Sequence, residues 1–416
     1  MRLEIEDLSH PQLNDAQKRA LDVASGLGFE LNSQSVLTAA RAKTGLNNFG
    51  SMDFLKRLDM WLEEAKSDCG ASEVAKTLVY LVCVRYAENR LRAESFIEFH
   101  PETELVEIDR PIIIAGLPRS GTTYLLGLLS ANSRLRSLPW WEATAPFTLV
   151  GEPKDFGTDK DPRWIQSNRS WERIEAVLPY LSAMHEFSAG HTSEDVELQA
   201  IDFSSWLLEW IIRAPRWRDY YLSTDQTPTY SYLKRIMQAL TVIRGPNRWV
   251  GKCPGHMEQL RALHSVFSDA TIVITHRDPV ASLQSVLTMH CYVARLLRRV
   301  VDPEEIAAYW IDRFERLLQA CVRDRDSIPS DRIQDVFFED LLSRGDVVIH
   351  NIYQTAELTF TTEARHESSA FRVNNPRGKY GRLNYRLERD FGIDPAKVRK
   401  RFQFYFERFP GVHREI

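Results

Sequence analysis

A glycine-bounded turn at residues 116–123 constrains this chain more than any other feature of its sequence. The run Pro111-Ile-Ile-Ile-Ala-Gly predicts a short buried strand, and Tyr124-Leu-Leu then opens a helix. Gly116 and Gly121 have the spacing of a phosphate-binding loop, in which backbone N–H groups and a helix N-terminus hold an anion. The alternative is an ordinary capped turn between a strand and a helix.

The turn lacks the lysine that nucleoside triphosphatases carry after the second glycine. In those enzymes the lysine reaches the terminal phosphates and the next Ser or Thr holds magnesium. Here the corresponding positions are threonines. The turn therefore suits a single 5′-phosphate group held without a metal, with the candidate binding residues Arg119, Ser120, Gly121, Thr122 and Thr123.

Strand and helix patterns alternate along the rest of the chain. Further strands are predicted at 248–251, 271–275 and 333–338, and each is followed by a predicted helix, at 257–267, 280–290 and 339–342. This alternation predicts an α/β fold with a mostly parallel sheet covered by helices.

Two helices outside this core are clear in the sequence. Residues 72–92 place Leu78, Leu81, Val82 and Tyr86 on one buried face. Residues 304–326 form an amphipathic helix that Asp302 can cap. Its predicted buried stripe is Ile306, Trp310, Phe314, Leu317 and Cys321.

The chain is expected to contain a helical N-terminal extension over residues 1–104 and an α/β domain over 105–416. Within the domain we expect a helical insertion at 140–245, which holds seven of the ten tryptophans, and a C-terminal loop and helices at 346–416. The extension has three possible roles, all of which remain open. It can cover the active site, form a homodimer or simply pack on the core.

Composition excludes several classes of protein. The net charge of -4 gives no general attraction for nucleic acid. The 5 cysteines include no C-x-x-C pair, so neither a disulfide framework nor a cysteine zinc site is indicated. The first residues lack the pattern of a secretion signal, and no apolar run approaches the ~20 residues of a membrane helix. We expect a cytoplasmic protein with no transmembrane segment.

Two more strand ends carry polar groups suited to an anion. Arg277 follows the strand at 271–275, with Ser282 and Ser285 on the next helix, and an arginine fork with a hydroxyl suits a second phosphate. Lys252 and His256 follow the strand at 248–251. A surface salt bridge for the arginine and a structural role for the histidine are the alternatives.

A basic loop at residues 375–385 is a further candidate. Arg377, Lys379 and Arg382 can close over an anion, and Tyr380 or Tyr385 can lie against a base. Composition alone favours a solvated basic turn.

These segments, in this order, resemble the sulfotransferases that use 3′-phosphoadenosine 5′-phosphosulfate (PAPS), most closely the bacterial group related to the tyrosylprotein and carbohydrate enzymes. The motifs that carry the resemblance are Leu117-Pro-Arg-Ser-Gly-Thr-Thr, Lys252-x-Pro-x-His, His276-Arg-Asp-Pro with Ser285, and Phe338-Glu-Asp-Leu. Arg377-Gly-Lys-Tyr-Gly and the segment after Phe391 are similar too. The resemblance covers roughly residues 105–416.

The resemblance implies a P-loop NTPase-like three-layer sandwich and a donor site for PAPS, with adenosine 3′,5′-bisphosphate as product and no metal. It implies that residues 119–123 hold the 5′-phosphosulfate and that Arg277 and Ser285 hold the 3′-phosphate. The similar loop adds Arg377, Gly378, Lys379 and Tyr380 to the nucleotide site. Arg119 stands where the cytosolic hormone and drug sulfotransferases carry lysine, which points away from that branch.

For the reaction we expect Arg119 and Lys252 to stabilise the transferring group. Glu142, in Trp140-Trp-Glu-Ala, is implied as the base by its spacing from Arg119, and His256 and His185 are the rivals. The predicted acceptor is a hydroxyl or amine of a small lipophilic or aromatic molecule. A P-loop kinase or NTPase-like phosphotransferase and a non-catalytic nucleotide-binding protein are the competing functions.

Overall fold

Five parallel strands form the sheet that carries the glycine-bounded turn. The computed structural model describes residues 2–148, 155, 157–245, 247–376 and 378–415. The strands lie in the order β3-β4-β2-β5-β6, and every neighbouring pair is parallel. Their bounds are β2 Ile112–Gly116, β3 Leu135–Arg136, β4 Arg248–Lys252, β5 Thr271–His276 and β6 Ile333–Phe337. The predicted α/β fold with a mostly parallel sheet is confirmed.

The short strands were the ones that the sequence did not predict. β3 has two residues, and so do β1 (Arg2–Leu3) and β7 (Arg382–Leu383), which pair with each other in a separate small sheet. A strand of two residues carries no alternation of apolar and polar positions, so no pattern marks it in the sequence.

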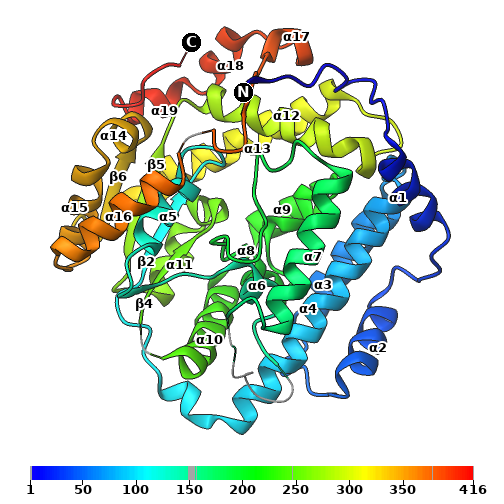
Figure 1. Cartoon of the computed structure of the whole chain (residues 1–416), viewed down its shortest axis with the longest axis horizontal. Helices are drawn as coiled ribbons and strands as arrows, with labels where there is room; N and C mark the ends of the chain where they lie inside the picture. Colours follow the sequence, from blue (N-terminus) through cyan, green and yellow to red (C-terminus); the bar gives the residue numbers. More distant parts are fainter. Residues whose placement is uncertain (1, 149–154, 156, 246, 377, 416) are drawn as a thin grey trace.

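The two faces of the sheet pack into different groups of helices, because successive side chains of a strand point to opposite sides. Ile112 and Ile114 of β2 pack with the helices that cover one face, which are α5 Thr122–Ser130, α14 Phe338–Ser343, α15 Gly345–Thr355 and α16 Thr362–Asn374. Ile113 and Ala115 belong to the larger core on the other face. That core includes α11 Leu260–Val266, α12 Pro279–Leu297 and α13 Pro303–Asp324. Figure 1 shows α14, α15 and α16 together beside the sheet.

The first hundred residues are helical, as expected. They form α1 Asp15–Ser25, α2 Ser33–Thr44, α3 Leu55–Ser67, α4 Glu73–Phe99 and the 3₁₀ turn η1 Pro101–Leu105. Figure 1 shows this group on the side of the molecule opposite α15 and α16. One hydrophobic core runs from Ile5 to Val412, so it crosses the boundary expected at residue 104.

The predicted buried face of α4 is half wrong. Val82 and Tyr86 are buried as expected, but Leu78 and Leu81 are 37% and 51% exposed. Val79 on a neighbouring row is fully buried instead. α4 packs against α1, α2, α3, α10 and α12, which cover most of its circumference, and Leu78 and Leu81 lie on the strip that is left facing solvent.

Residues 140–245 are largely helical and lie between the sheet and the N-terminal helices (Figure 1). Their elements are α6 Trp140–Thr144, α7 Pro162–Val177, α8 Val196–Gln199, η2 Ala200–Asp202, η3 Trp206–Trp210, α9 Pro215–Ser223 and α10 Thr227–Arg244. Trp141, Trp206 and Trp217 are almost fully buried. These three rings therefore serve as core between helices.

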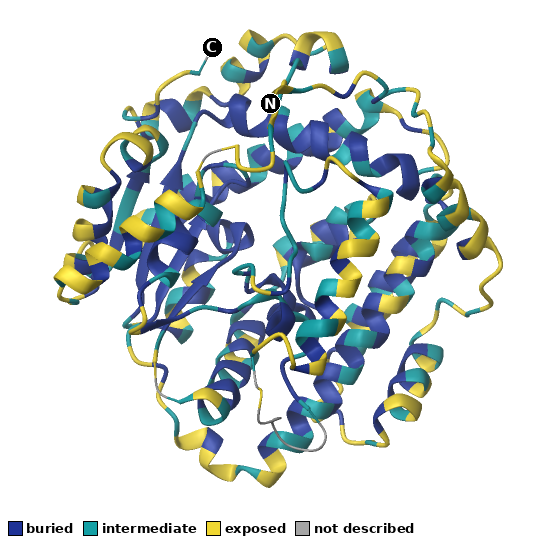
Figure 2. Ribbon diagram, in the orientation of Figure 1, coloured by how far each residue is buried: buried dark blue, intermediate teal, exposed yellow. Residues whose placement is uncertain are grey.

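α13 forms where the sequence predicts it. Asp302 caps the helix by accepting the backbone N–H groups of Glu304 and Glu305 at 3.0 and 3.1 Å. The predicted stripe is buried from Trp310 to Cys321, whereas Ile306 is only partly covered. Figure 2 shows β2, β4, β5 and α12 in the colour of buried residues along almost their whole length.

The remaining elements are a 3₁₀ turn after β4, another after α13, and three short helices near the C-terminus. They are η4 Pro254–Glu258, η5 Arg325–Ser327, α17 Leu387–Phe391, α18 Pro395–Arg401 and α19 Gln403–Arg408. No helix in the described part of the chain combines the length and the apolar character needed to cross a bilayer.

Candidate active site at the carboxyl edge of the sheet

The turn between β2 and α5 has the form of an anion-binding loop. Gly121, which precedes α5, has a φ of 92°, and no side chain caps this end of the helix. Arg119 also adopts a left-handed conformation, with a φ of 70°. Because this conformation is costly for a residue with a Cβ, the surrounding contacts must hold Arg119 there. The free N–H groups and the positive end of α5 are thus available to an anion.

Gly116 and Ser120 fix the shape of the turn. A Cβ on Gly116 would lie 2.1 Å from Oγ1 of Thr275, and its φ is 148°. The buried Ser120 hydroxyl donates to the carbonyl of Leu117 at 2.6 Å and lies 2.6 Å from the same Thr275 oxygen. The Ser120 side chain therefore faces inward and ties the loop to β5, and the Thr122 side chain is likewise buried.

Arg119, Ser285 and Arg277 converge beside the loop, as the sequence predicts. Nε of Arg119 donates to Oγ of Ser285 at 3.0 Å, and a second guanidinium nitrogen donates to the carbonyl of Met184. Arg277 donates to the carbonyl of Arg119 at 2.7 Å. The Arg277 guanidinium also lies 4.2 Å from the centre of the Phe338 ring, which comes from the fourth motif. Two cations and a hydroxyl thus meet on one side of the loop.

Lys252 lies on the other side of the loop. Its ammonium donates to Oγ1 of Thr123, in the first turn of α5, at 3.2 Å. It also forms an ion pair with Glu194, whose carboxylate is 3.8 Å from Nε2 of His185. Burial alone raises the pKa of Glu194, but the charges of Lys252 and His185 outweigh it and lower that pKa to about 2. Glu194 therefore stays ionised and holds the buried ammonium in place.

Glu194 is a site residue that the sequence analysis missed. The signal available in the sequence is the gathering of titratable residues between 185 and 195, where two histidines lie close to three acids. None of the predicted strands or loops includes that segment, so only the folded chain brings it to the carboxyl edge of the sheet.

His256 is buried and both of its ring nitrogens are engaged. Nδ1 lies 2.8 Å from the hydroxyl of Tyr230, and Nε2 lies 3.1 Å from a carboxylate oxygen of Asp195. The backbone N–H of Asp195 in turn donates to the carbonyl of Lys252 at 2.9 Å. This geometry favours a positioning role: His256 fixes Asp195, and through it the adjacent Glu194, against the end of β4.

Glu142 is also buried, and both of its carboxylate oxygens are engaged. Its two oxygens accept Arg136 at 2.9 Å and Arg244 at 2.8 Å, and its side chain is 1% exposed. Burial lowers the pKa of Arg136 to about 10 although the Glu142 carboxylate acts in the opposite direction. This geometry favours a structural ion-pair role for Glu142, and its role as base stays a prediction.

Comparison with known proteins agrees with this arrangement. Residues 111–362 match the family model described as "Sulfotransferase family". The chain belongs to the sulfotransferase family. A sulfotransferase transfers a sulfuryl group, and that class of reaction, unlike phosphoryl transfer by a kinase, is what the family supports. No curated protein sequence matches the chain.

Solved structures of bacterial sulfotransferases share the fold. Sulfotransferase STF9 from Mycobacterium avium is 23% identical, with a TM-score of 0.82 over 93% of this chain and 98% of its own. Sulfotransferase STF1 from Mycobacterium tuberculosis is 25% identical, with a TM-score of 0.79 over 89% of this chain and 98% of its own. The likeness extends beyond the matched family segment into the N-terminal helices.

The basic loop of this sulfotransferase is exposed where it is described, and Arg377 lies outside the described residues. Gly378 has a φ of 81°, and the Lys379 ammonium lies 5.3 Å from the centre of the Tyr380 ring. Burial and the nearby Glu186 carboxylate raise the pKa of Tyr380 to about 12. Because Glu186 is close to Met184, whose carbonyl accepts Arg119, the basic loop reaches a segment that contacts the glycine-bounded turn.

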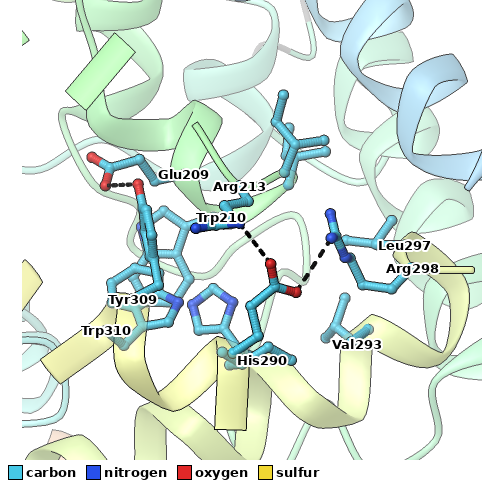
Figure 3. Close-up of a pocket in the computed structure, with 14 residues that line it drawn as sticks. Glu209, Trp210, Arg213, His290, Val293, Leu297, Arg298, Tyr309 and Trp310 are labelled. Carbon is cyan, nitrogen blue, oxygen red and sulfur yellow. Dashed lines mark hydrogen bonds and ion pairs between the residues drawn. The ribbon is translucent and has the colours of Figure 1, made fainter. Parts of the chain in front are cut away.

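A separate pocket of the sulfotransferase lies between η3, α12 and α13 (Figure 3). It is a cavity of about 60 Å³ with Trp210, Tyr309 and Trp310 on one side and Val293, Leu297 and Arg298 on the other. His290, which lines it, stacks on Trp210 with ring centres 4.7 Å apart. None of the residues predicted for the active site lines this pocket.

Within the described ranges, no group of three or more His, Cys, Asp and Glu side chains has the arrangement of a metal site.

Proposed function

We propose that this sulfotransferase takes its sulfuryl group from PAPS and passes it, without a metal, to a hydroxyl or amine of a small lipophilic or aromatic acceptor. One observation carries the proposal. The uncapped N-terminus of α5 lies between two cationic groups, Arg119 with Arg277 and Ser285 on one side and Lys252 on the other. A ligand with two separate anionic groups matches this distribution of charge.

The chemistry of these donors fits the two ends of PAPS. The backbone N–H groups of residues 121–123 and the dipole of α5 would hold the 5′-phosphosulfate, as helix N-termini hold other phosphates. The guanidinium of Arg277 and the hydroxyl of Ser285 would hold the 3′-phosphate by charge-assisted hydrogen bonds. PAPS, when bound, supplies an activated sulfuryl group whose leaving group is a phosphate.

Arg119 and Lys252 would stabilise the charge that develops during transfer. Lys252 already donates to Thr123 in the first turn of α5, so its ammonium is within reach of an anion held there. Glu194 fixes the lysine side chain before any ligand arrives, which removes the need to reorganise it during the reaction.

For the acceptor proton we propose His185 as base. Its Nδ1 lies 3.0 Å from the backbone carbonyl of Glu186, so the proton of the neutral ring is held on Nδ1. Nε2 lies 3.8 Å from Glu194, the carboxylate that also pairs with Lys252, so the negative charge of Glu194 stabilises a proton taken up at Nε2. Of the three bases considered from the sequence, His185 is the one that is partly exposed, with 25% of its side chain accessible.

Calorimetric titration with three nucleotides tests the donor site. Adenosine 3′,5′-bisphosphate is titrated in the presence of a chelator, with adenosine 5′-monophosphate and ATP as comparisons. Wild type is expected to bind the bisphosphate without metal. Arg277→Met is expected to weaken bisphosphate binding about 10-fold or more, the value of a charge-assisted hydrogen bond, and to leave monophosphate binding unchanged. Two results would contradict the proposed donor site. One is that wild type binds only magnesium-ATP, and the other is that Arg277→Met weakens binding of the bisphosphate and of the monophosphate equally.

A panel of acceptors of graded polarity tests the acceptor class. Release of the bisphosphate product from PAPS is measured with phenols, aliphatic alcohols, amines and free sugars. The proposal expects the phenols and apolar alcohols to be turned over faster than the sugars. A preference for free sugars would overturn the acceptor class, and no turnover of any acceptor, despite bisphosphate binding, would favour the non-catalytic alternative.

A further inference from the structure

The guanidinium assigned to the 3′-phosphate is already occupied by a carboxylate of the same chain. Nε and Nη2 of Arg277 donate to the two oxygens of Glu415 at 2.5 and 2.7 Å. The third nitrogen donates to the carbonyl of Arg119. A fork-to-fork pair of this kind is how arginine also holds phosphate, so Glu415 makes the contacts that a phosphate group would make.

The backbone of residue 415 is tethered at the same place. Its N–H donates to Oδ2 of Asp278 at 2.9 Å, and Arg399 donates to the same oxygen at 2.9 Å and to the Glu415 carbonyl. Asp278 is the N-cap of α12 and follows Arg277 directly in the third sequence motif. The tether therefore joins α18, which carries Arg399, and residues 411–415 to the strand end that carries Arg277.

On the side of Arg277 that faces residues 411–415 there is no room for a phosphate while the tether is closed. The cavity there, lined by Arg277, Phe338, His413 and Glu415 among others, has a volume of about 10 Å³. Such a volume holds roughly one water molecule. All three guanidinium nitrogens of Arg277 already have acceptors, so a 3′-phosphate can form a two-pronged contact with Arg277 only if Glu415 leaves.

We propose that Glu415 competes with the 3′-phosphate of the nucleotide for Arg277, and so weakens the hold on the bisphosphate product and speeds its release. This inference rests on the proposed donor site. A phosphate carries a charge of about -2 against -1 for the carboxylate, so a bound nucleotide displaces Glu415. The displaced carboxylate stays attached to the chain near Arg277, and it re-forms the pair when the product leaves.

The competition has a quantitative consequence. When a competing contact closes a site for most of the time, the observed affinity equals the affinity of the open site multiplied by the fraction of molecules in which the site is open. Removal of the Glu415 charge is expected to tighten binding of the bisphosphate about 3- to 10-fold. A nucleotide without a 3′-phosphate does not compete with Glu415 for Arg277, so its affinity is expected to be the same with and without the Glu415 charge.

Calorimetry on Glu415→Gln tests the proposal, with adenosine 3′,5′-bisphosphate and adenosine 5′-monophosphate as ligands. Glu407→Gln is the matched control, because Glu407 is an exposed glutamate on α19 whose side chain accepts a hydrogen bond from Gln403 at 3.2 Å. The expected result is tighter bisphosphate binding in Glu415→Gln alone, with monophosphate binding constant in all proteins. Arg399→Gln, which loosens the tether and leaves Arg277 intact, is expected to act in the same direction.

The outcomes separate the two proposals. Equal bisphosphate affinity in wild type and Glu415→Gln, or weaker binding in the variant, would overturn the competition and leave the donor site standing. Bisphosphate binding to neither protein would overturn both. In steady-state assays the competition also predicts a lower KM for PAPS in Glu415→Gln together with stronger inhibition by the product, since slow product release limits many enzymes.

Discussion

At the scale of single residues, His185 and Glu142 differ in what surrounds them, and this difference can be measured. His185→Gln removes the titratable nitrogen 3.8 Å from Glu194, and it leaves the ion pair between Glu194 and the buried Lys252 in place. The expected result is a fall in kcat of about 100-fold or more, the usual value of general base catalysis. The affinity for the bisphosphate and the free energy of unfolding are expected to stay near those of wild type.

Glu142→Gln should give the opposite pattern. The change leaves the guanidinium groups of Arg136 and Arg244 without their shared carboxylate in a buried site. Breaking a buried ion pair costs about 3–5 kcal/mol, so urea denaturation is expected to report a lower free energy of unfolding. A folded, stable Glu142→Gln protein with no turnover would establish Glu142 as the base and remove His185 from that role.

Gly116 offers a test of the loop itself. Gly116→Ala places a methyl group 2.1 Å from the Thr275 hydroxyl oxygen, so the loop or β5 must shift. Binding of the bisphosphate is expected to weaken at least about 10-fold, as catalytic geometry lost by 1 Å costs more than that. Gly392→Ala is the control, because Gly392 also has a positive φ, of 63°, but open space around its Cβ position. Unchanged affinity in Gly116→Ala would show that the loop does not hold the nucleotide.

Most residues of the proposed donor site could be placed together from the sequence because each lies at or just after the end of a parallel strand. Arg119, Lys252 and Arg277 stand at the ends of β2, β4 and β5, and the carboxyl ends of parallel strands meet at one edge. Glu194 and Glu415 were not predictable in the same way. Their positions depend on how the segment before α8 and the segment after α19 return to that edge, and no local pattern encodes such a path.

At the scale of elements, α13 joins the site to the rest of the fold through one buried arginine. Arg313 forms ion pairs with Glu209, next to Trp210 in η3, and with Glu258 in η4, two residues after His256. All three side chains are fully buried. The helix therefore positions the turn that carries His256, and through it Asp195.

Arg313→Met tests this link. Removing the cation leaves two buried carboxylates unpaired, so the free energy of unfolding is expected to fall by about 3–5 kcal/mol. Arg316→Met on the same helix breaks only exposed ion pairs, with Asp312 and Asp219, and is expected to change it by less than about 1 kcal/mol. Similar denaturation midpoints for the two variants would contradict a structural role for the buried cluster.

The buried residues of a helix were easier to predict when the helix packs against the core on one side only. α13 rests on the core along one stripe, and its cap and stripe were read correctly from Asp302 and the residues from Trp310 to Cys321. α4 is covered by other helices on most of its sides, and the strip left to solvent includes Leu78 and Leu81, so the prediction that placed them on the buried face failed. Periodicity predicts a helix, but the number of its neighbours is a property of the tertiary structure.

At the scale of the whole molecule, buried neutral histidines should make the fold sensitive to acid. Burial lowers the pKa of His290 to about 3, and burial together with the nearby His185 lowers that of His191 to about 4. The unfolded chain binds these protons near pH 6.5, so it takes up more protons than the native state below that value. Their contribution to stability is complete above pH 6.5 and is lost as the pH falls towards 3.

His290→Phe isolates one of these contributions. The variant keeps an aromatic ring between Trp210 and Trp310 and removes the group that titrates. Urea denaturation between pH 7 and pH 4 is expected to lose stability with a smaller slope than wild type, by up to about 1.4 kcal/mol per pH unit. The exposed His366 provides the control, and His366→Gln is expected to follow the wild-type slope. An unchanged slope in His290→Phe would contradict the buried neutral state of His290.

A crystal structure of the protein with adenosine 3′,5′-bisphosphate, grown with a chelator, tests the central claim most directly. The account predicts density for the 5′-phosphate at the loop formed by residues 119–123 and for the 3′-phosphate between Arg277 and Ser285, with Glu415 moved away from Arg277. A bisphosphate bound elsewhere, or a loop that fills only when magnesium-ATP is supplied, would contradict the donor site and the function built on it.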